Sequence, residues 1–336
     1  MMRKLLITFS LMSLLNPLIG YEIPNKEKPM KGLKSKIEIE YKYDEKFGEF
    51  LEIQKNKIIT RYDTSGYLKE KQEFSSYKEF IKKYVYEYDQ MGNEIVYQEI
   101  YGSGEMSVDQ TLSNEYNSKG YLIQTTDHNS QSNESIRRIY NYDPKGNMIE
   151  KSYYKVDTDK LNKKEVYIFD SKGQLIEEAL YAPGGSTIKK TKHIYDSSGN
   201  RIESLSFNSK GKETSKIVYT YRRGGKLERM DKIWLDGNLK NQSVTSKFDL
   251  GGNKIEGVGL TSKGLVDYRF TYKYDSNDNV IEVRRHDPDR FLSSYQTYQY
   301  DIHGRIIEYN FWVYKEMFEE IKEFPVEKTT YEYELY

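Results

Sequence analysis

A short phrase made of an aromatic residue, a turn and a glycine recurs ten times along the chain, at intervals of 26 to 28 residues. A fixed period of this size is typical of repeat architectures, in which each unit buries its apolar surface only against its neighbours. The spacing therefore predicts one continuous repeat body, and it favours a scaffold or binding surface over a pocket enzyme. The copies begin at Tyr62, Tyr88, Tyr116, Tyr142, Phe169, Tyr195, Tyr221, Phe248, Tyr274 and Tyr300.

Each phrase encodes a hairpin turn. An Asp or Asn at its second position accepts a hydrogen bond from the backbone two residues further on. The glycine supplies the positive φ that closes a type I turn with a bulge. In the Tyr274 copy Asp278 replaces the glycine, and aspartate is among the residues that best tolerate positive φ. The clearest structural turn residues are Asp89 with Gly92, Asp143 with Gly146, Asp196 with Gly199, and Asp301 with Gly304.

Strand patterns flank every turn. Alternating aromatic residues precede the turn and an Ile-Glu pair follows it, while a weaker second turn lies midway between copies. Each unit thus holds two strands, and ten units predict an all-β antiparallel meander of about twenty strands. Strand twist should curve this meander into an open or coiled sheet or tube. A five-bladed β-propeller is the alternative, because two units, about 53 residues, would make one four-stranded blade.

The N-terminal residues differ from the rest. Arg3 and Lys4 precede an apolar run from Leu5 to Leu15, which predicts a signal peptide over residues 1–20 and hence a secreted protein, either periplasmic, cell-surface or extracellular. Residues 21–36 are polar and predict a flexible linker. The repeat domain is expected over residues 37–336, with a loop or short helix inserted at 314–328. No second long apolar run occurs, so we expect no membrane span.

Composition limits the chemistry. Lys plus Arg and Asp plus Glu both total 52, so we expect no nucleic-acid partner. The chain has no cysteine, and its four histidines form no metal-binding motif. The turn aspartates and the repeated glutamates have sufficient structural roles in turns and on a solvated face. We therefore predict no metal, no cofactor and no catalytic residue.

The phrase aromatic-Asp-x-x-Gly-Asn-x-Ile, preceded by Tyr-x-Tyr, resembles the YD-repeat family, also called RHS repeats. The resemblance covers Tyr62 to about Glu308, and the spacing here is longer than that of the family. It implies a secreted or envelope-associated β-repeat protein and supplies no catalytic residues. Large members enclose a C-terminal toxin, but we expect no toxin domain here, so that role is not implied.

Aromatic residues carry the functional hypothesis. Most of the 33 tyrosines follow the period-two pattern, which the buried side of a sheet explains. Exposed aromatics stack on sugars or anchor proteins, and Trp234 and Trp312, away from the main turns, are the candidate ligand-binding residues. We predict an exported, non-enzymatic, adhesin-like binding protein for a glycan or a protein. The alternative is a secreted glycan-active enzyme with its site on an irregular loop, which should show converging carboxylates where inward residues break the Tyr/Ile pattern.

Overall fold

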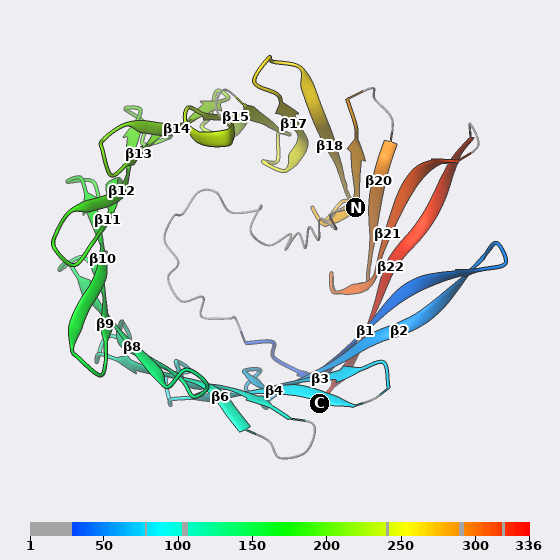
Figure 1. Ribbon diagram of the computed structural model, residues 1–336, viewed down its shortest axis with the longest axis horizontal. Coiled ribbons are helices and arrows are strands. Elements are labelled where there is room, and N and C mark those ends of the chain that lie inside the picture. Colours follow the sequence, from blue (N-terminus) through cyan, green and yellow to red (C-terminus); the bar gives the residue numbers. More distant parts are fainter. Residues whose placement is uncertain (1–28, 78, 103–106, 240–241, 289–291, 318–319) are drawn as a thin grey trace.

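The chain folds into one antiparallel sheet of 22 strands (Figure 1). A computed structural model describes residues 29–336 except 78, 103–106, 240–241, 289–291 and 318–319. A short 3₁₀ turn, η2 (Gly237–Leu239), is the one helical element in these described ranges. The strands are β1 (Leu33–Lys46), β2 (Glu49–Tyr62), β3 (Leu68–Ser75), β4 (Phe80–Tyr88), β5 (Glu94–Tyr101), β6 (Ser107–Tyr116), β7 (Leu122–Asn129), β8 (Glu134–Tyr142), β9 (Met148–Lys155), β10 (Lys160–Phe169), β11 (Leu175–Tyr181), β12 (Thr187–Tyr195), β13 (Arg201–Asn208), β14 (Glu213–Tyr221), β15 (Leu227–Trp234), β16 (Ser243–Phe248), β17 (Lys254–Leu260), β18 (Val266–Tyr274), β19 (Val280–His286), β20 (Leu292–Tyr300), β21 (Ile306–Met317) and β22 (Glu320–Leu335).

The first and last strands close the sheet into a ring. β1 pairs with β22 from Leu33 opposite Leu335 to Lys42 opposite Glu327, and we call this pairing the seam. The predicted all-β hairpin meander is confirmed, and the tube is closed rather than open. The alternative of a five-bladed propeller is wrong, because hydrogen-bonded pairing continues from each strand to the next without the breaks that separate blades.

The repeated phrase forms the same bulged turn that its residue types predict. At the Tyr142 copy, the Gly146 N–H donates to the Asp143 carbonyl at 3.0 Å, and the Asn147 N–H donates to Asp143 Oδ1 at 2.8 Å. Gly146 has a φ of 89°, and Asp278, which replaces the glycine in another copy, has a φ of 63°. The Asp143 carboxylate therefore fixes the loop. Gly146, three residues later, supplies the left-handed backbone conformation.

Alternate hairpins point to opposite edges of the ring. The ten turns of the repeated phrase lie at one edge, the main-turn rim, and the midway turns lie at the other, the half-turn rim. The chain ends of the sheet meet at the main-turn rim, where the Tyr336 N–H donates to the Gly32 carbonyl at 3.1 Å. The Met30 N–H also donates to the carbonyl of Gly66 in the first main turn at 2.8 Å.

Two predicted segment assignments need correction. β1 begins at Leu33, so the end of the predicted linker 21–36 is strand; the signal peptide 1–20 and residues 21–28 lie outside the described residues. Of the segment 314–328, predicted as a loop or short helix, residues 314–317 belong to β21 and residues 320–328 to β22, while 318–319 lie outside the described residues. Cross-strand pairs such as Val313 with Phe324 and Tyr314 with Glu323 hold this acidic segment extended, because pairing and packing outweigh weak local helix propensity.

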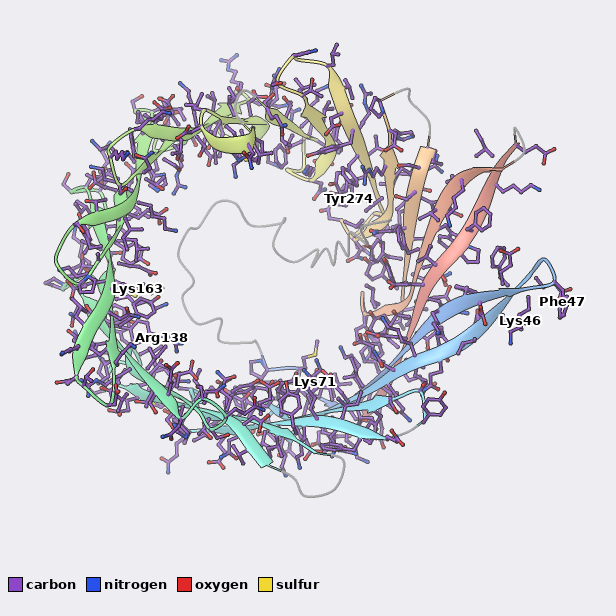
Figure 2. The ribbon with its side chains drawn as sticks, viewed as in Figure 1. Lys46, Phe47, Lys71, Arg138, Lys163 and Tyr274 are labelled. Atoms are coloured by element: carbon purple, nitrogen blue, oxygen red, sulfur yellow. The ribbon has the colours of Figure 1, made fainter. Side chains whose placement is uncertain are left out.

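The two faces of the wall differ. Figure 2 shows Lys71, Arg138, Lys163 and Tyr274 on the inner side of the ring. Directly opposed residues on antiparallel strands share a face, and so do alternate residues along a strand. Applied to the observed register, this places most of the aromatic columns on the inner face, including Tyr140 beside Arg138.

The wall is a single layer of strands. With 22 strands about 4.8 Å apart, the ring is at least about 34 Å across, wider than tubes of about 16–18 strands that already hold a channel. The described side chains line the wall and leave the middle of the ring unfilled (Figure 2). Buried apolar residues are accordingly few, and the main cluster lies on the inner face and comprises Leu122, Tyr140, Met148, Tyr167 and Leu175.

Candidate functional site

The tyrosines that open the repeated phrase tie successive units together. Tyr142 Oη donates to the Leu122 carbonyl at 2.8 Å, and the acceptor is the sixth residue after the start of the preceding copy. These hydroxyls are engaged in the wall and are structural rather than ligand-binding. The same bond joins Tyr116 to Glu94, Tyr195 to Leu175, Tyr221 to Arg201, Tyr274 to Lys254, Tyr300 to Val280, and Tyr333 to Ile306.

Neighbouring main turns also pack on one another. The ring of Tyr67 stacks on Tyr88 with centroids 4.9 Å apart, and its hydroxyl lies over Gly92. Tyr121 stacks on Tyr142 at 5.0 Å and lies over Gly146 in the same way. A Cβ at either glycine would overlap the tyrosine hydroxyl of the preceding unit, so these glycines are needed for close approach as well as for positive φ.

The other named turn residues lie in equivalent turns. Asp89, Asp196 and Asp301 each accept hydrogen bonds from backbone N–H groups two and four residues further on. The Asn200 side chain donates to Asp196, and this bond is the largest cause that lowers the pKa of Asp196 below its usual range. The Asp196 carboxylate therefore stays ionised and acts within its own loop.

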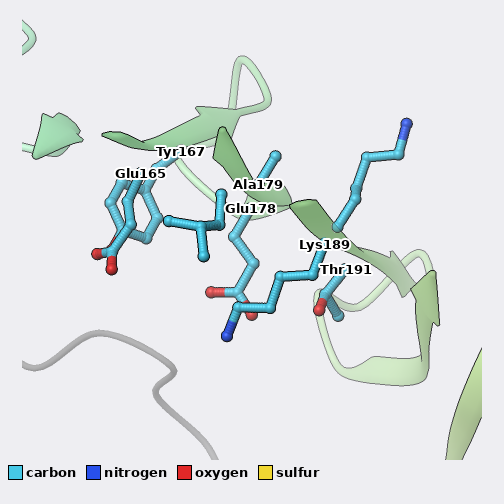
Figure 3. Close-up of a pocket in the computed structure, with 8 residues that line it drawn as sticks. Glu165, Tyr167, Glu178, Ala179, Lys189 and Thr191 are labelled. Carbon is cyan, nitrogen blue, oxygen red and sulfur yellow. The ribbon is translucent and has the colours of Figure 1, made fainter. Parts of the chain in front are cut away.

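A shallow depression of about 230 Å³ interrupts the inner wall over β10, β11 and β12 (Figure 3). Figure 3 shows the Glu165, Glu178 and Lys189 side chains pointing to one side of the sheet. Lys190 follows Lys189 along β12 and therefore lies on the other face. Glu165 shares its face with Lys163, which Figure 2 places inside the ring, so this polar group faces the interior. The lining residues are Glu165, Tyr167, Glu178, Ala179, Leu180, Lys189, Lys190 and Thr191.

Glu165 is held by two phenols. Tyr153 Oη donates to its Oε1 at 3.0 Å, and Tyr167 Oη donates to its Oε2 at 2.8 Å. Burial, and then the bond to this carboxylate, raises the pKa of Tyr167, so the phenol remains a protonated donor. The Lys163 ammonium lies 4.5 Å from the centroid of the Tyr153 ring. Rings, a carboxylate and ammonium groups thus alternate over a small area of the inner wall.

Glu178 lies on the next strand, directly opposite Tyr167. Burial raises the pKa of Glu178, and the negative charge of Glu165 adds to this effect. The positive charges of Lys189 and Arg201 and a hydrogen bond from Thr191 act in the opposite direction. The two carboxylates therefore occupy different surroundings on adjacent strands, one bonded by two phenols and the other partly desolvated.

His193 extends the polar group along β12. Its Nδ1 lies 2.9 Å from Ser204 Oγ on β13, and its side chain is buried. Burial, followed by the positive charge of Arg201, lowers the pKa of His193 to about 4, so the imidazole is neutral at physiological pH. Within the described ranges no three His, Asp or Glu side chains gather in a way that would hold a metal ion.

The two tryptophans do not form one site. Trp234 lies opposite Ser215, on the inner face shared with Thr191, with the Lys232 ammonium 4.9 Å from its ring. Trp312 lies on the outer face of β21, where its ring stacks on Tyr295 with centroids 4.6 Å apart and planes inclined by 10°. One face of the Trp312 ring is therefore covered.

Sequence reasoning missed the depression. Glu165 stands at an inward position that is Ile58, Tyr84 or Ile217 in some other units, and Glu178 at one that is Tyr97 or Tyr309 in others. The copy beside them begins with Phe169 instead of tyrosine. This departure from the repeat is the sequence feature that could have indicated the depression. The sequence could not show that the two positions face the same side of adjacent strands, because register across a bulge decides this.

No family model matches the chain, and no curated protein matches it. Among solved structures, a TcdB2–TccC3 chain is similar at 14% identity over 81% of this chain and 15% of that chain, with a TM-score of 0.41. A porin-like protein from Bacteroides uniformis is similar at 10% identity over 91% of this chain and 99% of the other, with a TM-score of 0.33. The present chain thus spans about 15% of the TcdB2–TccC3 chain.

In the part of the chain that the structure describes, no helix has the length and apolar character needed to cross a membrane.

Proposed function

We propose that this protein is an exported, non-enzymatic scaffold of the YD-repeat family, and that it binds an extended glycan along its tyrosine-lined inner wall. The observation that carries the proposal is the concentration of aromatic rings that the register places on the inner face, interleaved with polar groups at the depression. Aromatic rings stack on the C–H faces of sugars, and carboxylates and ammonium groups bond their hydroxyls. Export rests on the N-terminal sequence pattern, which places the protein in the periplasm, at the cell surface or outside the cell.

The balance of charge around the depression favours a glycan over a strongly charged polymer. Glu165 and Glu178 face the interior together with Lys163 and Lys189, so neither sign dominates. The outer face instead carries ordinary ion pairs such as Lys247 with Glu256, at 2.7 Å, which need no ligand to explain them.

Neighbouring residues on β9 provide a matched test. Tyr153 faces the interior, and Tyr154 faces outward. On a glycan array and then by calorimetry with the best glycan, Tyr153→Ala should weaken binding at least tenfold, while Tyr154→Ala should bind as the unmodified protein does. Circular dichroism checks that both variants keep the sheet. If the unmodified protein binds no glycan, or both variants lose binding equally, the inner wall is not the binding surface.

Glycan hydrolysis is a second candidate, because the depression has carboxylates on two adjacent strands of the inner wall, rather than on the irregular loop that the sequence suggested for an enzyme. Two carboxylates in different surroundings occur where the tyrosine pattern breaks, as acid and base pairs require. Glu178 would give its proton to the glycosidic oxygen as the bond breaks, and Glu165 would assist attack by water at the sugar carbon. The release of reducing ends, abolished by both Glu178→Gln and Glu165→Gln, would establish this activity. Binding without such release supports the scaffold.

A further inference from the structure

Two hairpins beside the seam, β1–β2 and β21–β22, splay outward from the ring and away from each other (Figure 1). β1 and β2 have 14 residues each, β21 has 12 and β22 has 16, whereas the other strands have 6 to 10. Pairing of β1 with β22 ends at Lys42 opposite Glu327, and the two hairpins then diverge. We call residues 43–52 the first seam arm and residues 313–317 with 320–326 the second seam arm.

The tip of the first seam arm displays a phenylalanine in a costly conformation. Phe47 has a φ of 55° and Gly48 a φ of 84°, which is the type I′ turn that favours Asn-Gly. A bulky residue at positive φ costs roughly 1–2 kcal/mol, and the side chain recovers nothing by burial because it is fully exposed, at 106%. Such an outlier is a reason to look for function. Leu51 nearby and Ile321 on the other arm are also exposed, at 45% and 56%.

Each seam arm also has a free strand edge. Tyr43–Lys46 of β1 pairs with β2 but with no second strand, and Glu320–Val326 of β22 pairs with β21 alone, within the described residues. Near the point of divergence Phe50 and Phe324 touch edge to face, with centroids 5.6 Å apart. Free edges offer unpaired N–H and C=O groups to an added strand, and here two of them flank one opening.

Charge indicates what kind of strand fits. Asp44, Glu45 and Glu49 have no ion-pair partner among the described residues, whereas Lys46 is the one cation between residues 43 and 52. Two copies of such an acidic arm would repel each other, and an anionic lipid surface would repel it as well. A basic strand with apolar residues complements both the charge and the exposed side chains.

We propose that the seam arms form a docking site for an extended, basic polypeptide strand of a partner protein. The strand adds to the free edges of β1 and β22, its apolar side chains cover Phe47 and Leu51, and its cations pair with the acidic groups of the first arm. This site lies at the half-turn rim, apart from the inner wall, and does not depend on glycan binding.

The test uses the full chain and labelled ten-residue peptides in fluorescence anisotropy. A peptide of alternating lysine and valine should bind. Two control peptides should bind at least tenfold more weakly. One has proline at two of its valines and cannot complete the hydrogen-bond ladder, and the other has glutamate in place of lysine. Equal binding of the proline peptide would show mere charge attraction and would overturn the proposal, as would no binding of the first peptide.

The decisive variant is Phe47→Asn, because asparagine suits the type I′ turn and the arm should fold at least as well. It should weaken binding of the lysine–valine peptide at least tenfold without lowering the melting temperature of the protein. Leu265→Asn, at another exposed apolar residue in a turn of the same rim, is the control and should leave binding unchanged. If the unmodified protein self-associates and Phe47→Asn removes this association, the arms bind a second copy. If the unmodified protein binds vesicles and Phe47→Asn removes this binding, the arms bind lipid. Either result would overturn the proposal.

Discussion

Glycines at the same position of the phrase have different structural roles in different copies. Gly92 and Gly173 both have positive φ, but only Gly92 lies under a tyrosine of the preceding turn. Gly173→Ala should destabilise the protein by about 1 kcal/mol because of backbone strain. Gly92→Ala should cost roughly 1–3 kcal/mol more, because Tyr67 must move. Urea unfolding of both variants measures the difference, and equal losses would show that the contact with Tyr67 has no energetic weight.

The buried histidine makes stability depend on pH. His193 has a pKa of about 4 in the fold, while an unfolded histidine titrates near 6.5. As the pH falls below 6.5 the unfolded chain gains a proton that the folded chain does not, so this stabilisation is present above pH 6.5 and declines toward pH 4. The loss by pH 4.5 should be about 2 kcal/mol.

The test is to measure the free energy of unfolding at pH 7 and at pH 4.5, for His193→Gln and for the unmodified protein. The variant should lose less stability between the two values, whereas His303→Gln, in an exposed turn, should behave as the unmodified protein does. An unchanged pH dependence in His193→Gln would contradict the assignment.

Between neighbouring units, the phrase tyrosines act as cross-links. Tyr142→Phe removes the bond to the Leu122 carbonyl and should cost about 1 kcal/mol. The reverse change, Phe248→Tyr, places a hydroxyl where the other copies bond the preceding unit and should stabilise the protein by up to about 1 kcal/mol. Thermal unfolding measures both, with Tyr154→Phe on the outer face as control. A neutral Tyr142→Phe would mean that ring packing alone joins the units.

Local chemistry in the sequence predicted the elements well. Asp143 and Gly146 specify their turn through a side-chain acceptor and a permissive backbone, so the strands on either side followed from the period. The extended conformation of residues 314–317 and 320–328 did not follow, because it depends on pairing between β21 and β22 rather than on local propensity. The phrase tyrosines were interpreted as one side of a sheet, but their bonds to carbonyls about 20 residues earlier depend on how neighbouring hairpins align.

For the whole molecule, closure removes sheet edges along the seam. Deleting residues 320–336 takes away β22 and exposes both β1 and β21 as long free edges, which are templates for association. Sedimentation velocity should show concentration-dependent association of the deletion variant beyond that of the full chain. Replacing residues 315–322 by Asn-Gly shortens the second seam arm while keeping the seam, and it should not have this effect. Equal behaviour of both variants would contradict a protective role for closure.

The functional surface was also beyond sequence reasoning at this scale. Alternation predicted that tyrosines share a face, but which face surrounds an interior depends on the closure between Leu33 and Leu335. Trp234 and Trp312 were chosen for their position in the unit, and the register places them on opposite faces. The curvature of 22 strands, and not any single motif, turns one side of the sheet into an enclosed wall.

The seam also sets the order in which the molecule can assemble. Every other pair of adjacent strands is separated by only a few residues of chain, whereas the seam joins residues about 300 positions apart, such as Lys34 and Glu334. Bringing such distant segments together costs about 2 kcal/mol more entropy than closing one unit. Hairpins between neighbouring strands should therefore form first, and pairing of β1 with β22 should be the late, slow step of folding. The same amides should open first in the native state, so hydrogen–deuterium exchange would proceed from the seam around the circle.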